Sequence, residues 1–101
     1  MSASSSAGAS SEDRQSVSVT ASLPDGVALH ARPAAELVRA AGRLPLVVTV
    51  SANGKQANAK SVLQILALGA TGGTELTLSA SGPGAEEAVT ALAGVIAGLR
   101  A

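Results

Sequence analysis

The stretch LVVTVSANGKQANAKSVLQILAL, residues 46–68, decides the fold because it places two predicted strands, a turn and a helix in succession. Its first six residues, Leu46 to Ser51, are rich in β-branched side chains, which favour a strand. Asn53-Gly54 follows shortly after, and this pair is a strong hairpin signal because both central residues of a type I′ turn need a positive φ. The sequence therefore predicts a β-hairpin here.

The second half of this stretch predicts the other arm of the hairpin and a short helix. The polar segment from Lys55 to Lys60 is expected to return as a strand at the edge of a sheet. Ser61 can cap a helix that runs from Ser61 to Leu68, and Gly69 is expected to end it.

Upstream of the hairpin, the pattern changes from strand to helix. Residues Ser16 to Leu23 alternate polar and apolar side chains, which is typical of a half-buried strand. From Pro33 onward the apolar residues fall at helical spacing, and Gly42 is expected to end that helix. The apolar face of this helix is formed by Ala34, Leu37, Val38 and Ala41.

Downstream of the hairpin, a strand and a helix complete the chain. Thr74 to Ser81 alternates again, and a Gly-Pro-Gly loop at residues 82–84 follows it. The last predicted helix begins at Ala85, with Glu86 and Glu87 in the first turn, where the helix dipole favours negative charge. Its continuous apolar stripe consists of Ala85, Ala88, Val89, Leu92, Val95, Ile96 and Leu99.

These elements give the order βαββαβα and an α+β fold class. We expect a two-layer open-faced sandwich, with a four-stranded antiparallel sheet and three helices on one face. Residues 1–15 are rich in Ser and Ala and are expected to form a flexible tail, so residues 16–101 form the single domain.

Composition excludes several classes of function. Seven basic residues balance seven acidic ones, and no aromatic side chain is present to stack on a base, which argues against nucleic-acid binding. The chain has no cysteine and one histidine, a poor set of ligands for a metal, and we expect no cofactor. No apolar run approaches the ~20 residues that span a bilayer, and no secretion signal is recognisable. We therefore expect a cytoplasmic protein without membrane insertion.

His30, the one histidine, lies where a loop meets a predicted helix. If it occupies the N-cap, the free N–H groups of the first turn and the helix dipole create a site for an anion next to its ring. Arg32 can add charge-assisted hydrogen bonds to phosphate oxygens. The residues therefore suggest a nucleophile beside an anion site, whereas a plain surface cap is the alternative interpretation.

The string Leu29-His30-Ala31-Arg32-Pro33-Ala34 resembles the active-site signature of the HPr family, the histidine phosphocarriers of the bacterial phosphotransferase system. The resemblance extends from about Val17 to the C-terminus, in element order and in loop positions. Further family landmarks are Asn53-Gly54-Lys55, Ala59-Lys60-Ser61 and Leu68-Gly69-Ala70, at the family's usual spacing from the histidine.

This resemblance implies that the chain is a phosphoryl carrier and not an enzyme with turnover of its own. His30 would take a phosphoryl group on Nδ1 from phosphorylated enzyme I and pass it to a histidine of a IIA domain of a sugar permease. Arg32 would hold the phosphoryl oxygens. Ser61 would correspond to the position that a dedicated kinase phosphorylates in some relatives, although a serine that opens a helix is usually only an N-cap.

The resemblance also implies a docking surface on a protein that we expect to be a monomer. An apolar patch near the second predicted helix would contact partners, together with residues near the histidine and one basic side chain; the candidates are Ala31, Ala35, Arg39, Val62, Leu63 and Leu66. Core packing is the alternative for each leucine. One departure from the family is the pair Val27-Ala28, which lengthens the loop before His30 and could reshape the rim of the site.

Two other functions are consistent with the sequence. The chain could be a regulatory relative that controls a kinase or a transcription factor through phosphorylation-dependent docking. It could also be a sensor of a small ligand in which His30 is a passive cap.

Overall fold

Four strands form one antiparallel sheet in a computed structural model that describes residues 16–100. The order across the sheet is β1 (Ser16–Ser22), β4 (Glu75–Ser81), β2 (Thr49–Ala52) and β3 (Lys55–Asn58). Each neighbouring pair is antiparallel, so β1 and β3 are the two edges. The prediction of a flexible tail concerns residues 1–15, which lie outside the described residues.

The predicted hairpin between β2 and β3 is confirmed. Asn53 has φ 53° and Gly54 has φ 74°, as a type I′ turn requires, and Ala52 pairs with Lys55 on either side of it. The Asn53 side chain also donates from Nδ2 to the carbonyl oxygen of Leu68 at 3.0 Å. This bond ties the hairpin to the end of the following helix.

All four strands are shorter than their sequence patterns suggest, and β4 begins at Glu75, one residue after the predicted start at Thr74. The strand predicted from Leu46 begins only at Thr49, the residue at which pairing with both neighbouring strands starts. The return strand ends at Asn58 because its Oδ1 accepts a hydrogen bond from the Lys60 N–H at 2.8 Å, which turns the chain away. Leu23 lies beyond β1, although its side chain is buried.

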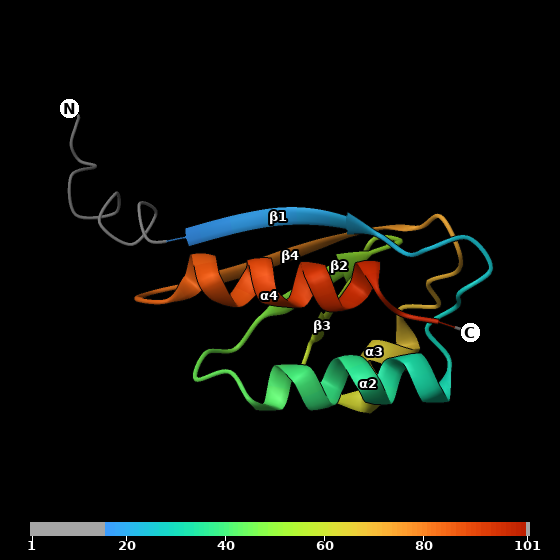
Figure 1. Cartoon of the computed structure of the whole chain (residues 1–101), viewed down its shortest axis with the longest axis horizontal. Helices are drawn as coiled ribbons and strands as arrows, with labels where there is room; N and C mark the ends of the chain where they lie inside the picture. Colours follow the sequence, from blue (N-terminus) through green and yellow to red (C-terminus); the bar gives the residue numbers. More distant parts are fainter. Residues whose placement is uncertain (1–15, 101) are drawn as a thin grey trace.

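All three helices lie on one side of the sheet (Figure 1). They are α2 (Ala31–Gly42), α3 (Val62–Ala67) and α4 (Ala85–Ala97). Helix α2 begins two residues before Pro33, which is tolerated in the first turn because the N–H groups there lack helical partners. The predicted two-layer sandwich is therefore confirmed.

The core between the layers is built from aliphatic side chains alone. The sheet contributes alternating residues such as Val50, Leu76 and Leu78, and α4 contributes Val89 and Ile96, all fully buried. The opposite face of the sheet is lined with small polar side chains: Ser18, Thr20, Thr49, Ser51, Thr77 and Ser79. Among residues 16–100, no helix has the length and apolar character needed to cross a membrane.

Candidate functional site

His30 occupies the N-cap of α2, as the sequence predicts. Its backbone is extended, with φ −89° and ψ −168°, and its side chain is exposed. The imidazole makes no capping hydrogen bond to the helix that follows. The ring is therefore accessible from solvent and is not occupied in stabilising the helix end.

The amide groups next to the ring are also free. The first bond of the helix runs from the Ala34 N–H to the His30 carbonyl oxygen at 2.8 Å, and Pro33 has no N–H. Within residues 16–100, the N–H groups of Ala31 and Arg32 have no hydrogen-bond acceptor. Both donors lie at the positive end of the helix dipole, where an anion is favoured.

Three arginines line an open cleft of about 490 Å³ along α2. Arg32 and Arg39 line it from α2, and Arg100 lines it from the segment that follows α4. Glu36 completes the charged lining. Sequence reasoning missed Arg100, because nothing in the local pattern indicates that the end of the chain folds back beside α2.

The predicted docking residues of α3 form an exposed apolar patch. Leu63 is 77% exposed, whereas Val62 and Leu66 are 39% and 38% exposed. Ile65, on the opposite side of the short helix, is fully buried. The three exposed side chains are called the α3 patch below.

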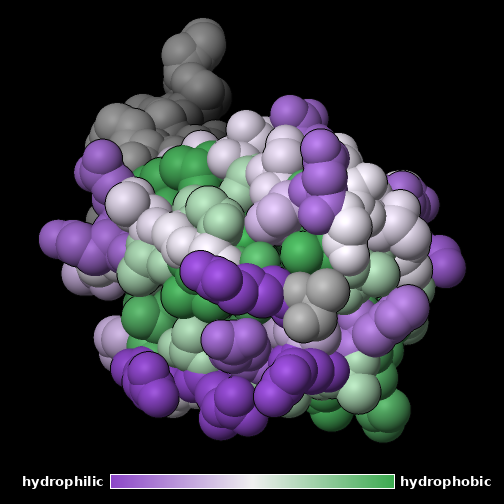
Figure 2. Space-filling view, turned by 45° about the vertical axis from the view of Figure 1, so that its right-hand side comes forward, coloured by the Kyte–Doolittle hydropathy of each residue, from purple (hydrophilic) through white to green (hydrophobic). Residues whose placement is uncertain are grey.

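The α3 patch lies next to the helix that carries the histidine, because α2 and α3 contact each other. At the start of α2, Ala31 is exposed and Ala35 is half-buried. Figure 2 brings this end of the molecule forward. It shows hydrophilic residues in purple across the lower part of this face, and hydrophobic residues in green at its lower right edge. The exposed apolar residues of α3 and Ala31 therefore belong to two helices that pack against each other.

Ser61 lies at the start of α3 and has a structural role there. Its Oγ accepts a hydrogen bond from the Gln64 N–H at 3.3 Å, which confirms the predicted N-cap. The Gln64 side chain in turn accepts a bond from the Asn58 N–H at 2.7 Å, through Oε1. This network fixes the helix to the end of β3.

The lengthened loop before His30 contributes to the core as well as to the rim. Val27 is only 4% exposed and lies in the hydrophobic core, and the side chain of Ala28 is half-buried. A turn closed by the Val27 N–H and the Pro24 carbonyl oxygen precedes it, and Gly26 takes φ +79° in that turn. The prediction that the two residues reshape the rim stays a prediction, and Val27 contributes in addition to the core.

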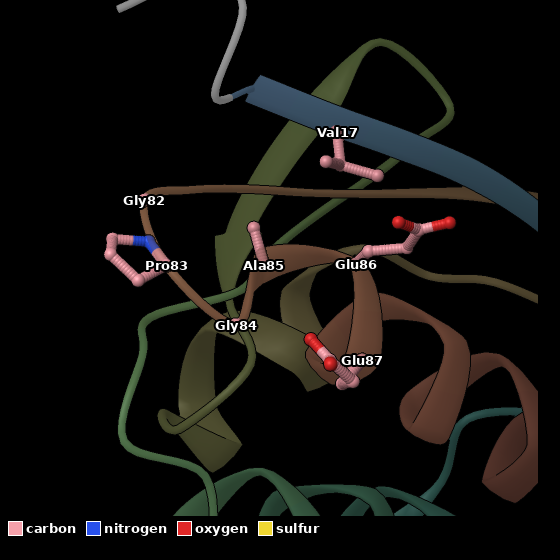
Figure 3. A pocket seen from close by; sticks show the side chains of 7 residues that line it. All are labelled: Val17, Gly82, Pro83, Gly84, Ala85, Glu86 and Glu87. Atoms are coloured by element: carbon pink, nitrogen blue, oxygen red, sulfur yellow. The ribbon is translucent and has the colours of Figure 1, made fainter.

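A separate pocket of about 310 Å³ lies at the opposite end of the molecule. Figure 3 shows it between the start of β1 at Val17 and the turn from Gly82 to Glu87 that opens α4. Figure 1 shows α4 beginning at the end opposite to the one where α2 begins, so this pocket is not part of the histidine site. Among residues 16–100, no three His, Cys, Asp or Glu side chains are grouped to hold a metal ion.

The domain is a small open-faced sandwich with an exposed histidine at a helix N-cap, and comparison with known proteins shows the family to which it belongs. Residues 16–98 match the family model described as the phosphorylation site of the HPr component of the phosphotransferase system. The chain belongs to the HPr family of phosphocarrier proteins.

Individual relatives show how far the similarity extends. The phosphocarrier protein HPr of Mycoplasma capricolum is 40% identical over 73 residues, which cover 72% of this chain and 82% of that protein. The crystal structure of HPr from Bacillus anthracis superposes with a TM-score of 0.75 at 34% identity, covering 80% of this chain and 96% of that one. An HPr dimer from Thermoanaerobacter tengcongensis superposes with a TM-score of 0.61 at 40% identity, covering 77% and 90%.

Proposed function

We propose that this chain carries a phosphoryl group on His30 from phosphorylated enzyme I to a IIA domain of a sugar permease. The observation that carries the proposal is the exposed imidazole at the N-cap of α2, which makes no capping bond. It belongs to the residue directly before Ala31 and Arg32, whose N–H groups have no acceptor among residues 16–100. A phosphoryl group has anionic oxygens that can accept hydrogen bonds from these two N–H groups.

The proposed reaction consists of two transfers. In the first, a ring nitrogen of His30, assigned as Nδ1 by resemblance to the family, attacks the phosphorus of the phosphorylated donor. A bond forms between this nitrogen and phosphorus, and the bond between phosphorus and the donor breaks, with its electron pair returning to the donor. In the second, a nucleophile of the IIA domain attacks the same phosphorus, and His30 leaves with the electron pair of the broken bond.

The side chains around His30 have separate parts in this proposal. Arg32 holds the phosphoryl oxygens through charge-assisted hydrogen bonds. Arg39 and the α3 patch contact the partner proteins, together with Ala31 and Ala35 at the start of α2. The chain is a carrier without turnover of its own, because its partners supply both the phosphoryl donor and the phosphoryl acceptor. We place it in the cytoplasm.

Phosphoryl transfer from phosphoenolpyruvate in the presence of enzyme I tests this function. We expect one acid-labile phosphate per chain, and none for His30→Ala. Arg32→Ala is expected to slow the transfer by roughly 10- to 100-fold, as loss of a charge-assisted bond of about 1.5–3 kcal/mol predicts, and Arg32→Lys is expected to retain part of the rate.

Ser61→Ala is the matched control, because acid-labile phosphate on that variant excludes the serine as the acceptor. Labelling of His30→Ala equal to that of the wild type would contradict the proposal. A labelled chain that transfers nothing to any IIA domain would instead favour a regulatory role.

We also propose that Ser61 is a site of regulatory phosphorylation. Its half-buried hydroxyl lies directly before Val62 of the α3 patch. A phosphate there would place about two negative charges beside the docking surface and weaken docking by repulsion and by desolvation.

A further inference from the structure

Two loops lie against each other behind the histidine. One joins β1 to α2 and ends at His30; the other joins α3 to β4. Three backbone hydrogen bonds connect them: the Leu23 N–H to the Thr74 oxygen at 3.0 Å, the Gly73 N–H to the Leu23 oxygen at 2.9 Å, and the Leu29 N–H to the Ala70 oxygen at 3.0 Å. The loop that carries the histidine is therefore held at both ends by the other loop.

Gly72 lies between these bonds, close to the backbone of the opposite loop. A Cβ atom at Gly72 would lie 2.7 Å from the Gly26 nitrogen, 3.2 Å from the Pro24 oxygen and 3.4 Å from the carbonyl carbon of Asp25. All three atoms belong to the backbone of the opposite loop, so no flexible side chain could move aside. Only a residue without a side chain fits here.

A short segment, residues 26–30, connects the contact at Gly26 to the histidine, and two of its side chains are anchored in the core. Val27 and Leu29 are buried in the core on the far side of the Gly26 turn. The His30 N–H donates to the Ala28 oxygen at 2.8 Å, which holds the last three residues of the loop in a tight turn. Helix α2 has its own anchors in the core, such as Leu37, so displacement of the loop would shift the imidazole relative to the amide groups of the helix.

We propose that Gly72 is a positioning residue for phosphoryl transfer, because its missing side chain lets the β1–α2 loop seat His30 against the free amide groups of α2. This inference rests on the function proposed above for His30. Gly72 acts through the loop, and it touches neither the phosphoryl group nor the ring.

Two adjacent glycines allow a matched test. Gly72→Ala pushes a methyl group into the opposite backbone. Gly73→Ala strains a residue with φ +83°, but its Cβ would meet only the Asp25 carboxylate oxygen, at 4.0 Å. Both variants disturb the same loop, but only Gly72→Ala causes a clash with the backbone of the β1–α2 loop. We expect Gly72→Ala to slow phosphoryl transfer from enzyme I roughly 10- to 100-fold, because small misplacement of a reacting group has effects of this size. Gly73→Ala is expected to stay within a few-fold of the wild type.

The rates are to be measured at a temperature where circular dichroism shows each variant to be folded. NMR provides a readout that needs no partner: the ring signals of His30 and the amide signals of Ala31 and Arg32 should shift in Gly72→Ala and stay in place in Gly73→Ala. A transfer rate for Gly72→Ala within two-fold of wild type, or a loss equal to that of Gly73→Ala, would overturn the proposal.

If Gly72→Ala does not fold, Val27→Ala tests whether the β1–α2 loop positions His30. This variant loosens the same loop by removing buried side-chain atoms from the core. Slower transfer with shifted His30 signals supports the positioning role, and a wild-type rate with unshifted signals overturns it. Failure of the wild-type chain to accept a phosphoryl group would contradict the proposed function alone. The NMR shifts report the position of the His30 ring without any phosphoryl transfer, so they test the role of Gly72 separately.

Discussion

His30 and Ser61 are both N-cap residues, and they use this position in different ways. The Ser61 hydroxyl accepts a hydrogen bond from the Gln64 N–H and so stabilises the start of α3. The His30 side chain makes no such bond, and among residues 16–100 the N–H groups of Ala31 and Arg32 have no acceptor. At the scale of single residues, the Ser61 side chain stabilises the start of its helix, whereas the His30 side chain does not.

Substitutions of Ser61 should therefore separate stability from docking. Ser61→Ala is expected to lower the free energy of unfolding by about 1 kcal/mol, because the Gln64 N–H loses its acceptor. Ser61→Asp keeps an acceptor and should preserve most of the stability, but its charge should weaken binding to enzyme I.

Urea denaturation and titration with enzyme I measure these two effects. Ser22→Ala, at an exposed position at the end of β1, serves as the control and should change neither. A Ser61→Asp variant that binds as tightly as the wild type would argue against a role for charge at this position.

At the scale of elements, α3 is too short to be stable alone and depends on its neighbours. It has six residues, and side chains from the hairpin contact its last carbonyl groups: Asn53 Nδ2 donates to the Leu68 oxygen, and Lys55 Nζ donates to the Ala67 oxygen at 3.3 Å. Ile65 anchors the inner side in the core. With the helix fixed in this way, its outer side can expose leucines without loss of structure.

Truncation of the most exposed side chain on this helix should affect docking alone. Leu63→Ala is expected to raise the KM for transfer from enzyme I by roughly 5- to 30-fold, which corresponds to an interface side chain contributing about 1–2 kcal/mol. The free energy of unfolding should stay within about 0.5 kcal/mol of wild type, because Leu63 is 77% exposed.

Val47→Ala is the matched control, since Val47 is 55% exposed but lies outside α3. Steady-state kinetics and urea denaturation of both variants provide the comparison. Equal KM values for Leu63→Ala and the wild type would remove Leu63 from the docking surface.

At the scale of the whole molecule, the candidate functional features gather at one end. Helix α2 begins there, with His30 at its cap, and the cleft lined by Arg32, Arg39 and Arg100 adjoins it. Figure 1 places the start of α4 and the start of β1 at the other end. His30 and the start of α2 therefore lie at the end of the molecule opposite the loop that opens α4.

The distribution of apolar surface also predicts the oligomeric state. Only four large hydrophobic side chains are exposed among residues 16–100, namely Val47, Val62, Leu63 and Leu66, which is little for a stable interface between copies. Sedimentation equilibrium is expected to give the mass of a monomer, 9.7 kDa. Twice this mass at micromolar concentration would show that the chain pairs, as the HPr dimer of Thermoanaerobacter tengcongensis does.

The sequence by itself determined the features that depend on neighbouring residues. The type I′ turn at Asn53-Gly54, the cap at Ser61 and the N-cap position of His30 were all predictable, because turns, caps and helix starts are set by side chains within a few positions of one another. Val62, Leu63 and Leu66, which the sequence offers as candidates for an apolar surface patch, are exposed on α3.

Only the tertiary structure decided the features that join distant segments. It placed β4 between β1 and β2, brought Arg100 beside Arg32, buried Val27 and set Gly72 against Gly26. Each of these depends on how the apolar faces of sheet and helices are buried together, and on which loops meet as a result. That burial is shared by the whole chain, so no local pattern of residues specifies it.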